Sequence, residues 1–539
     1  MDSEGPQNAA APSGLMPGGA ALDRPAAGAA RARAWAASDA GLVTLIAAGA
    51  CLLHFLTASQ YGYFRDELYF AACGQHLAWG YVDHPPLIAA ISWFTRRMLG
   101  DSLFSLRFFP ALSSGAKILL TAWMVAELEG GRFAQLLAAT AVFFCPVYLS
   151  MDNFLSMNSF EPLFWMGCAA IAMRIASGGS SRLWLVFGAV AGVGLLNKHS
   201  MLFFGLAIFL GLLASSGARH LRNPWIWLGA VLALAISSPN LLWEIRNHFP
   251  TLEIFRNIAR TKNVDLPWYD FIAQQALLVH PLAAPICVAG LWFFFATEQG
   301  RPYRFLGWAY VFLLLEMLVL KGRIYYMAPV YPMLFAAGAV LLEREIAARQ
   351  WEWAKWAIVV PLVAGGMIAA PLAAPILPVN AAVAYSRFWD VEKVRVETSD
   401  SGVLPQFFGD MFGWRNQVAV LASVYRNLSP RDRQRCAILA GNYGEAGAVD
   451  FFGAAYGLPR AISGHNNYYL WGPRGYSGDV VITVGMRRED LQPLFGSVEQ
   501  VATIRDPYAV ADENNLPVFL CRLPRMPLSQ AWPKLKFFG

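Results

Sequence analysis

The chain has 539 residues, of which 56% are hydrophobic and only 14% are charged. Soluble globular domains carry about 25% charged residues, so this composition predicts a polytopic α-helical membrane protein. The net charge of +6 is small for this length and no segment is rich in lysine and arginine, which argues against a nucleic-acid partner. The seven cysteines form no CxxC pair, so a zinc ribbon or a redox motif is not indicated. Cys436 and Cys521 lie in the less apolar C-terminal part, either as a disulfide or as two free buried thiols.

The N-terminal segment, residues 1–38, is rich in alanine, glycine and proline and lacks an apolar run, so we expect a disordered tail. The first apolar run starts near Gly41, too far along the chain for an ordinary cleaved signal peptide. Arg24, Arg31 and Arg33 precede this run. Because basic residues tend to stay on the cytoplasmic side, the tail is predicted to be cytoplasmic.

Residues 39–377 contain a series of apolar segments, which predict a transmembrane domain of about 11 helices. The predicted spans are 41–59, 103–126, 133–150, 159–176, 183–197, 200–215, 224–241, 272–297, 304–320, 324–343 and 355–377. An odd number of spans places the two ends of the chain on opposite sides of the membrane. Basic residues gather in the loops of one side, whereas the long loops 60–102 and 242–271 mix acids with bases, so the long loops are predicted to face outward.

From about residue 378 the acidic residues, asparagine and glycine become more frequent and the apolar runs become shorter. Segment 436–457 is typical of a strand, a glycine turn and a helix, and segments 479–485 and 517–523 are typical of buried strands. These features predict an α/β domain over residues 378–539. The odd number of spans places this domain outside the cytoplasm.

The loop between the first two spans concentrates charge in an otherwise apolar chain. Within residues 61–87 it holds Arg65, Asp66, Glu67, Asp83 and His84. An ionisable side chain costs roughly 2.5–3.5 kcal/mol at the bilayer centre, so these groups must lie in water or in a polar cavity. Asp66 and Glu67 are adjacent, which on a helix turns them about 100° apart and predicts different roles. Either Asp66 acts as a base or metal ligand, or the two acids cap a short helix over 67–79. Asp83 either caps the next helix or joins an acidic cluster that holds a divalent cation or steers a phosphate.

A second group of polar residues, Asp152, Asn158 and Glu161, lies on the short outward turn before the fourth span. Asn158 and Glu161 are three residues apart and so share one helical face. The group either belongs to an acceptor or active site or caps the fourth span. Lys198 stands at an outward helix end, where it either binds a phosphate or snorkels to the interface.

Basic and aromatic residues flank two further outward helix ends. Lys321, Arg323 and Tyr326 lie in KGRIYYMAPVYP, and Arg107 lies in SLRFFPAL near the outer end of the second span. Cations beside tyrosines suit a lipid phosphate, whereas the alternative is an aromatic belt with anchoring cations. His280, in VHPLAAP, is either a metal ligand or a histidine at a helix end.

Four of these segments resemble a known family in order and spacing. RDELY, YVDHPPL, SLRFFPAL and KGRIYYMAPVYP resemble the dolichyl-phosphate-mannose–protein mannosyltransferase superfamily over about residues 40–345. Its bacterial members include the transferase that adds aminoarabinose to lipid A. The resemblance implies the C-type membrane glycosyltransferase fold, an inverting reaction and a sugar donor carried on a polyprenyl phosphate.

The resemblance also implies roles for individual residues. Asp66 matches the catalytic carboxylate, and Asp83 matches an acid near a metal or the active site. Tyr81 and Tyr326 match tyrosines near the lipid phosphate. His84 replaces a lysine of the aminoarabinose transferases, and a neutral histidine is a poorer phosphate partner than lysine. In the second group, Asn158 occupies a position where an aspartate is common.

The sequence therefore predicts an inverting transferase that moves a hexosyl or pentosyl group from a polyprenyl-phosphate donor to a hydroxyl of a lipid, glycan or protein. It would work at the outer face of the bacterial cytoplasmic membrane. Asp66 and Glu67 are the catalytic candidates, and Asp83 and His280 are the candidate ligands of a divalent metal ion. The predicted donor-phosphate residues are Tyr81, His84, Arg107, Lys198, Lys321, Arg323 and Tyr326. The alternative is a non-catalytic transporter or flippase for a lipid-linked sugar, which the clustering of polar residues on one side of the membrane argues against.

Overall fold

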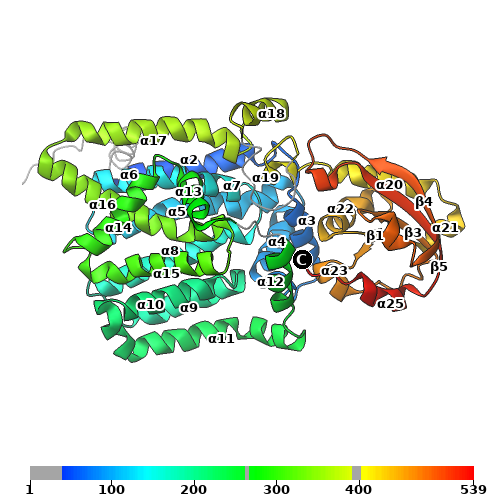
Figure 1. The fold of residues 1–539 in the computed structure, drawn as a ribbon, viewed down its shortest axis with the longest axis horizontal. Coiled ribbons are helices and arrows are strands. Elements are labelled where there is room, and N and C mark those ends of the chain that lie inside the picture. The colour runs from blue at the N-terminus through cyan, green and yellow to red at the C-terminus, as the bar shows by residue number, and fades with distance from the viewer. Residues whose placement is uncertain (1–38, 262–265, 391–401) are drawn as a thin grey trace, which may run out of the picture.

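The computed structural model describes residues 39–261, 266–390 and 402–539. It shows a long helical body with a smaller α/β domain at one end (Figure 1). Three helices lie where the two parts meet: α3 (Arg65–Gln75), α4 (Leu87–Leu99) and α12 (Pro250–Thr261). The predicted disordered tail, residues 1–38, lies outside the described residues.

Every predicted span coincides with one helix or with two consecutive helices of the body. These are α2 (Asp39–Thr57), α5 (Leu103–Glu127), α6 (Arg132–Phe143), α7 (Pro146–Met151), α8 (Met157–Ala176), α9 (Leu183–Asn197), α10 (Met201–Leu213), α11 (Pro224–Arg246), α13 (Trp268–Val279), α14 (Ala284–Ala296), α15 (Arg304–Val319), η3 (Ile324–Val330), α16 (Tyr331–Arg349) and α17 (Glu352–Ala373). Within the described ranges, 6 helices are long and apolar enough to cross a membrane, or up to 8 if two bent pairs each form one span. The chain is therefore a multi-pass membrane protein, and the number of about 11 spans remains a prediction.

Prolines divide two of the predicted spans. Pro146 begins α7 directly after α6, because a residue without a backbone N–H fits the first turn of a new helix. Pro281 lies between α13 and α14, which are bent by 108° relative to each other. Both breaks leave backbone and polar groups near the end of the body that faces the C-terminal domain, and such irregular backbone is tolerated in a membrane protein where it lines a cavity.

Small residues set the closest helix contacts in the body. A Cβ on Gly188 of α9 would lie 2.0 Å from the carbonyl oxygen of Gly229 of α11. A Cβ on Gly338 of α16 would lie 1.9 Å from the carbonyl oxygen of Ile286 of α14. Helices inside a bilayer gain most from close backbone packing, so glycines at these crossings hold the helix pairs together.

Helix α18 (Val379–Phe388) follows α17 and lies beside the helical body in Figure 1, and the C-terminal domain beyond it is built around a five-stranded sheet of order β2-β1-β3-β5-β4. The strands are β1 (Cys436–Ala440), β2 (Ala461–Ser463), β3 (Val480–Val484), β4 (Phe495–Ile504) and β5 (Leu516–Pro524). β2, β1 and β3 are parallel, whereas β5 runs antiparallel to both β3 and β4. The helices are α19 (Gln406–Gly409), α20 (Trp414–Arg426), α21 (Pro430–Arg435), α22 (Tyr443–Phe452), α23 (Asn466–Trp471), α24 (Arg488–Leu491) and α25 (Leu528–Ala531).

This domain agrees with the sequence-based expectation in its class and in three of its strands. The predicted strand, turn and helix over 436–457 correspond to β1 and α22. Cys436 and Cys521 are both buried and both carry free thiols, so they do not form the disulfide that was the other alternative. The location of the domain outside the cytoplasm remains a prediction.

Candidate active site

A cavity of about 610 Å³ lies where the helical body, the first long loop and the C-terminal domain meet. Its polar lining includes Arg65, Asp66, Asp83, Asn158, Lys198, His280, Arg323, Tyr326, Asp410 and Tyr443. Its apolar lining includes Phe203, Phe255, Leu277, Leu278, Leu372 and Phe407. The cavity thus combines charged groups with an apolar wall, which suits a ligand that has a charged head and a hydrocarbon tail.

Asp66 lies in the first turn of α3 and lines the cavity. Its Oδ1 accepts a hydrogen bond of 2.9 Å from the hydroxyl of Tyr443, the first residue of α22 in the C-terminal domain. Burial, followed by the negative charge of Asp66, raises the pKa of Tyr443 well above its usual value. Tyr443 is therefore a protonated donor at physiological pH, and its hydrogen bond favours the ionised form of Asp66.

Glu67 points in a different direction from its neighbour, as adjacency on a helix requires. It is fully buried and does not line the cavity. Its two carboxylate oxygens accept hydrogen bonds of 3.0 and 2.8 Å from Nε and Nη2 of Arg107. They also accept bonds from the backbone N–H groups of Phe64 and Leu155. The structure therefore places both Glu67 and Arg107 in a structural ion pair, away from the proposed catalytic and phosphate-binding positions.

Asp83 follows α3 and faces the same cavity as Asp66. Its Oδ1 accepts a hydrogen bond of 2.7 Å from the hydroxyl of Tyr69. The neighbouring His84 is fully buried outside the cavity lining, stacked on the ring of Tyr81 at 4.5 Å. Burial lowers the pKa of His84, so this histidine is neutral at pH 7 and cannot supply a positive charge.

Tyr81 is also buried away from the cavity, and its hydroxyl closes the loop after α3. It accepts a hydrogen bond from the N–H of Ala78 and faces the carbonyl oxygens of Cys73 and His76, each at 3.1 Å. Tyr81 and His84 therefore stabilise the conformation of the loop that carries Asp83. The structure does not bring either residue to a position where it could contact a phosphate in the cavity.

Lys198 lines the cavity and forms the centre of a polar group. Its Nζ donates hydrogen bonds of 2.7 Å to Asn158 Oδ1 and 2.8 Å to Glu161 Oε2. The ammonium also lies 4.8 Å from the ring centroid of Tyr326. Asn158 and Glu161 therefore share one face of α8, as their spacing predicted. The Lys198–Glu161 pair is neutral overall, which weakens Lys198 as a phosphate ligand and suits it to the hydroxyls of a sugar.

Two of the three predicted phosphate-binding residues in the segment KGRIYYMAPVYP line the cavity. Arg323 and Tyr326 line it, and the Nη1 of Arg323 donates a hydrogen bond of 3.0 Å to the hydroxyl of Tyr325. Lys321 is exposed and lies outside the lining residues. Arg323 is therefore the cation of this segment that can contact a ligand in the cavity that Asp66 also lines.

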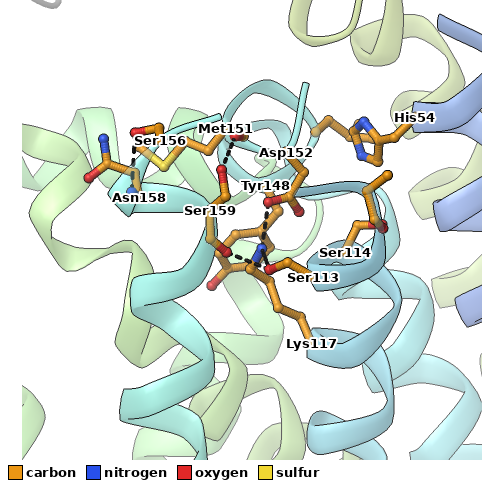
Figure 2. A network of polar contacts seen from close by, with 12 residues as sticks. His54, Ser113, Ser114, Lys117, Tyr148, Met151, Asp152, Ser156, Asn158 and Ser159 are labelled. Atoms are coloured by element: carbon orange, nitrogen blue, oxygen red, sulfur yellow. Dashed lines mark hydrogen bonds and ion pairs between the residues drawn. The ribbon is translucent and has the colours of Figure 1, made fainter. Parts of the chain in front are cut away.

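Asp152 belongs to a separate polar network inside the helical body (Figure 2). Its Oδ1 accepts a hydrogen bond of 2.6 Å from Nζ of Lys117, which also bonds the hydroxyl of Ser113. Both charged groups are almost completely buried. The pair joins α5 to the end of α7, and α7 lines the cavity through Ser150 and other residues. Asp152 thus supports a wall of the cavity and does not line it.

Metal binding remains a prediction. Asp83 and His280 both line the cavity, and Nδ1 of His280 accepts a hydrogen bond of 3.2 Å from the N–H of Leu282. Among the residues that the structure describes, no group of three or more histidine, cysteine, aspartate or glutamate side chains could hold a metal ion. The described side chains do not fit a metal centre that is built from three such ligands.

Comparisons with known proteins show what this chain is similar to. The family model of dolichyl-phosphate-mannose-protein mannosyltransferases matches residues 83–243. The lipid A galacturonosyltransferase RgtD of Rhizobium johnstonii is 27% identical over an alignment of 252 residues, which covers 44% of this chain and 50% of RgtD. Part of the chain is therefore similar to the dolichyl-phosphate-mannose-protein mannosyltransferases. The chain spans about half the length of this curated relative.

A likeness in fold to one solved structure extends over most of the chain. The crystal structure of ArnT from Cupriavidus metallidurans bound to undecaprenyl phosphate superposes with a TM-score of 0.61 and 17% sequence identity. It covers 89% of this chain and 98% of ArnT, and the apo structure of the same protein gives a TM-score of 0.59. The mannosyltransferase family match includes Asp83, Asn158 and Lys198, but Asp66 precedes it and Arg323 follows it.

Sequence reasoning gave no role to several side chains that line this cavity, among them Tyr443, Asn466 and Asp410. Asp410 pairs with Arg65 at 3.2 Å. Tyr443 lies in NYGEAGAVDFFG and Asn466 lies in SGHNNYYLWGP. No local pattern could have found them, because Tyr443 meets Asp66 across 377 positions of the chain.

Proposed function

We propose that the chain is an inverting glycosyltransferase that moves a sugar from a polyprenyl-phosphate donor to a hydroxyl acceptor at the outer face of the cytoplasmic membrane. One observation carries this proposal: a single cavity is lined by Asp66, by Arg323 and by many apolar side chains. A carboxylate supplies a base, a guanidinium binds a phosphate, and an apolar wall accepts an isoprenoid chain.

The donor would bind with its phosphate near Arg323 and Tyr326. Arginine forms forked hydrogen bonds to phosphate oxygens and remains charged at every physiological pH. The structurally similar ArnT was crystallised with undecaprenyl phosphate, which supports a polyprenyl carrier for this chain as well. The sugar would then face the polar group of Lys198, Asn158 and Glu161, whose mixed donors and acceptors suit several hydroxyls.

The chemical step needs a base and a stabilised leaving group. The acceptor oxygen attacks the anomeric carbon and forms the new glycosidic bond while the bond from that carbon to the phosphate oxygen breaks. The bonding electron pair leaves with the polyprenyl phosphate, whose charge Arg323 stabilises. The proton of the acceptor hydroxyl passes to the carboxylate of Asp66. A polyprenyl monophosphate leaves readily, so no general acid is required, and base assistance contributes typically about 10²–10⁴-fold.

The acceptor is proposed to be a lipid. The relative RgtD is named as a lipid A galacturonosyltransferase, and a cavity with an apolar wall at the body's end can receive an acceptor from the bilayer. Whether the transferred group is a hexose, a uronic acid or a pentose is decided by the test below. A divalent metal at Asp83 and His280 remains a proposal, and no step of this mechanism passes through it.

The purified chain in lipid nanodiscs tests the proposal. It would be incubated with lipid A and with undecaprenyl phosphates that carry glucose, mannose, galacturonic acid or aminoarabinose in turn. Mass spectrometry would follow the glycosylated acceptor and the released undecaprenyl phosphate, which should appear in equal amounts for one donor. The rival flippase is tested in proteoliposomes. Movement of a labelled donor between leaflets, with no transfer from any of these donors, would contradict the proposal.

A further inference from the structure

We propose that the C-terminal domain completes the active site and that Tyr443 is the residue by which it positions Asp66. The inference rests on the proposed function, because it assigns a task at the same cavity. It goes further in one respect: the α/β domain becomes part of the catalytic apparatus, because it contributes a hydrogen bond to the proposed base.

The geometry at Tyr443 is specific. Its hydroxyl donates a hydrogen bond of 2.9 Å to Asp66 Oδ1, and both residues line the cavity. Its ring packs against two others, with centroid distances of 4.7 Å to Tyr69 and 4.8 Å to His465. These aromatic contacts restrict the ring, so the hydroxyl is held where it orients the carboxylate.

Local sequence explains why this tyrosine reaches the first loop. The side chain of Asn442 caps α22 by accepting hydrogen bonds from the N–H groups of Gly444 and Glu445. A Cβ on Gly444 would lie 2.5 Å from Cγ of Arg65. A Cβ on Gly447, one turn further, would lie 3.0 Å from the backbone of Leu68. The glycines of NYGEAG therefore allow α22 to pack directly on α3 and to bring Tyr443 to Asp66.

The domain also contacts the second carboxylate of the loop. Oδ1 of Asn467 accepts a hydrogen bond of 2.8 Å from the N–H of Val82, directly before Asp83. The N–H of Asn467 points to the hydroxyl of Tyr69 at 3.4 Å, and Tyr69 donates to Asp83. Both acids of this loop that line the cavity thus accept a hydrogen bond from a tyrosine hydroxyl. For Asp66 the tyrosine belongs to the C-terminal domain, and for Asp83 it is Tyr69, which the C-terminal domain contacts through Asn467.

A phenol that donates to a carboxylate stabilises its ionised form and restricts its rotation. Loss of the Tyr443 hydroxyl should therefore raise the pH at which Asp66 ionises and let its side chain turn away from the acceptor. A charge-assisted hydrogen bond of this kind corresponds to about a 10- to 100-fold effect on turnover. The acid limb of the pH–rate profile should move upward by about one pH unit.

The test compares Tyr443→Phe with a matched control, Tyr468→Phe. Tyr468 is also buried in the C-terminal domain, and its hydroxyl donates to Asp450 at 3.2 Å, but it does not line the cavity. Both variants keep the ring and lose one buried hydroxyl beside an aspartate. The expected result is a 10- to 100-fold loss of turnover with a shifted acid limb for Tyr443→Phe, and turnover within about twofold of the original for Tyr468→Phe. An unchanged pH profile in Tyr443→Phe, or equal losses in both variants, would overturn the inference.

A second readout does not require transfer activity. Carbodiimides modify protonated carboxyl groups, so the labelling of Asp66 at a series of pH values, read by peptide mass spectrometry, reports its ionisation. The labelling curve should move to higher pH in Tyr443→Phe and stay in place in Tyr468→Phe. If the original chain transfers no sugar but the curve moves, the proposed function fails while the positioning by Tyr443 stands. If transfer occurs and the curve does not move, the positioning role is refuted alone.

Discussion

The adjacent acids Asp66 and Glu67 should respond in opposite ways to the same chemical change. Glu67 accepts four hydrogen bonds, two on each oxygen: Arg107 and Leu155 donate to Oε1, and Arg107 and Phe64 donate to Oε2. In Glu67→Gln, the amide nitrogen faces two donors whichever way it is turned. The change also leaves the charge of Arg107 buried without a carboxylate to neutralise it. Breaking a buried ion pair in this way costs about 3–5 kcal/mol.

Asp66→Asn should cost about 1 kcal/mol or less in stability, because this residue is partly exposed and the amide oxygen can still accept the bond from Tyr443. The assay heats each variant in detergent and measures the fraction that remains monodisperse in size-exclusion chromatography. The midpoint of Glu67→Gln should fall well below that of Asp66→Asn. The double variant Glu67→Met with Arg107→Met should recover part of the loss. Recovery is incomplete because Arg107 also donates to the carbonyl oxygens of Ala58 and Gly62.

A Glu67→Gln variant with normal thermal stability and strongly reduced turnover would refute this reasoning. It would return Glu67 to the catalytic role that the sequence suggested. The same experiment also tests whether Arg107 is structural, because a phosphate ligand would affect donor binding more than stability.

Three further predictions concern pH, the second acid and topology. Burial raises the pKa of Glu445 from its ordinary value of 4.5 to about 7, so the folded chain retains a proton that the unfolded chain has released. The thermal midpoint should therefore fall as the pH rises from about 5 to about 7, and Glu445→Gln should flatten this slope; an unchanged slope would contradict the assignment. Asp83→Asn should lower turnover, and partial restoration by added divalent cations would identify Asp83 as a metal ligand, whereas no restoration would limit it to its bond with Tyr69. A reporter fused after Gly539 should be extracytoplasmic and one inserted near Arg33 cytoplasmic, and two reporters on the same side would exclude an odd number of spans.

Local patterns predicted those features that depend on neighbouring residues. Hydropathy located the helices of the body. The rise in acidic residues, asparagine and glycine after about residue 378 indicated the C-terminal α/β domain. Spacing correctly placed Asn158 and Glu161 on one face of α8, where both bind Lys198. Adjacency correctly separated the directions of Asp66 and Glu67, although it could not tell which of the two faces the cavity.

Features that depend on distant partners could not be predicted. Arg107 looked like an interface cation, because nothing local shows that its partner is Glu67, 40 positions earlier. Lys117 sits within an apolar run, and only the fold brings Asp152 to it (Figure 2). The sequence analysis treated 133–150 and 272–297 as single spans, whereas the structure breaks them near Pro146 and Pro281, with a bend of 108° between α13 and α14.

The central claim is that Asp66 accepts the proton of the acceptor in a reaction that consumes a polyprenyl-phosphate sugar. The most direct measurement is single-turnover transfer by Asp66→Asn, made with the donor and acceptor that the original chain uses, together with donor binding. The account predicts that binding stays within a few-fold and that the transfer rate falls by about 10²-fold or more. Near-normal transfer by Asp66→Asn would contradict it, and the base would have to be sought elsewhere in the cavity.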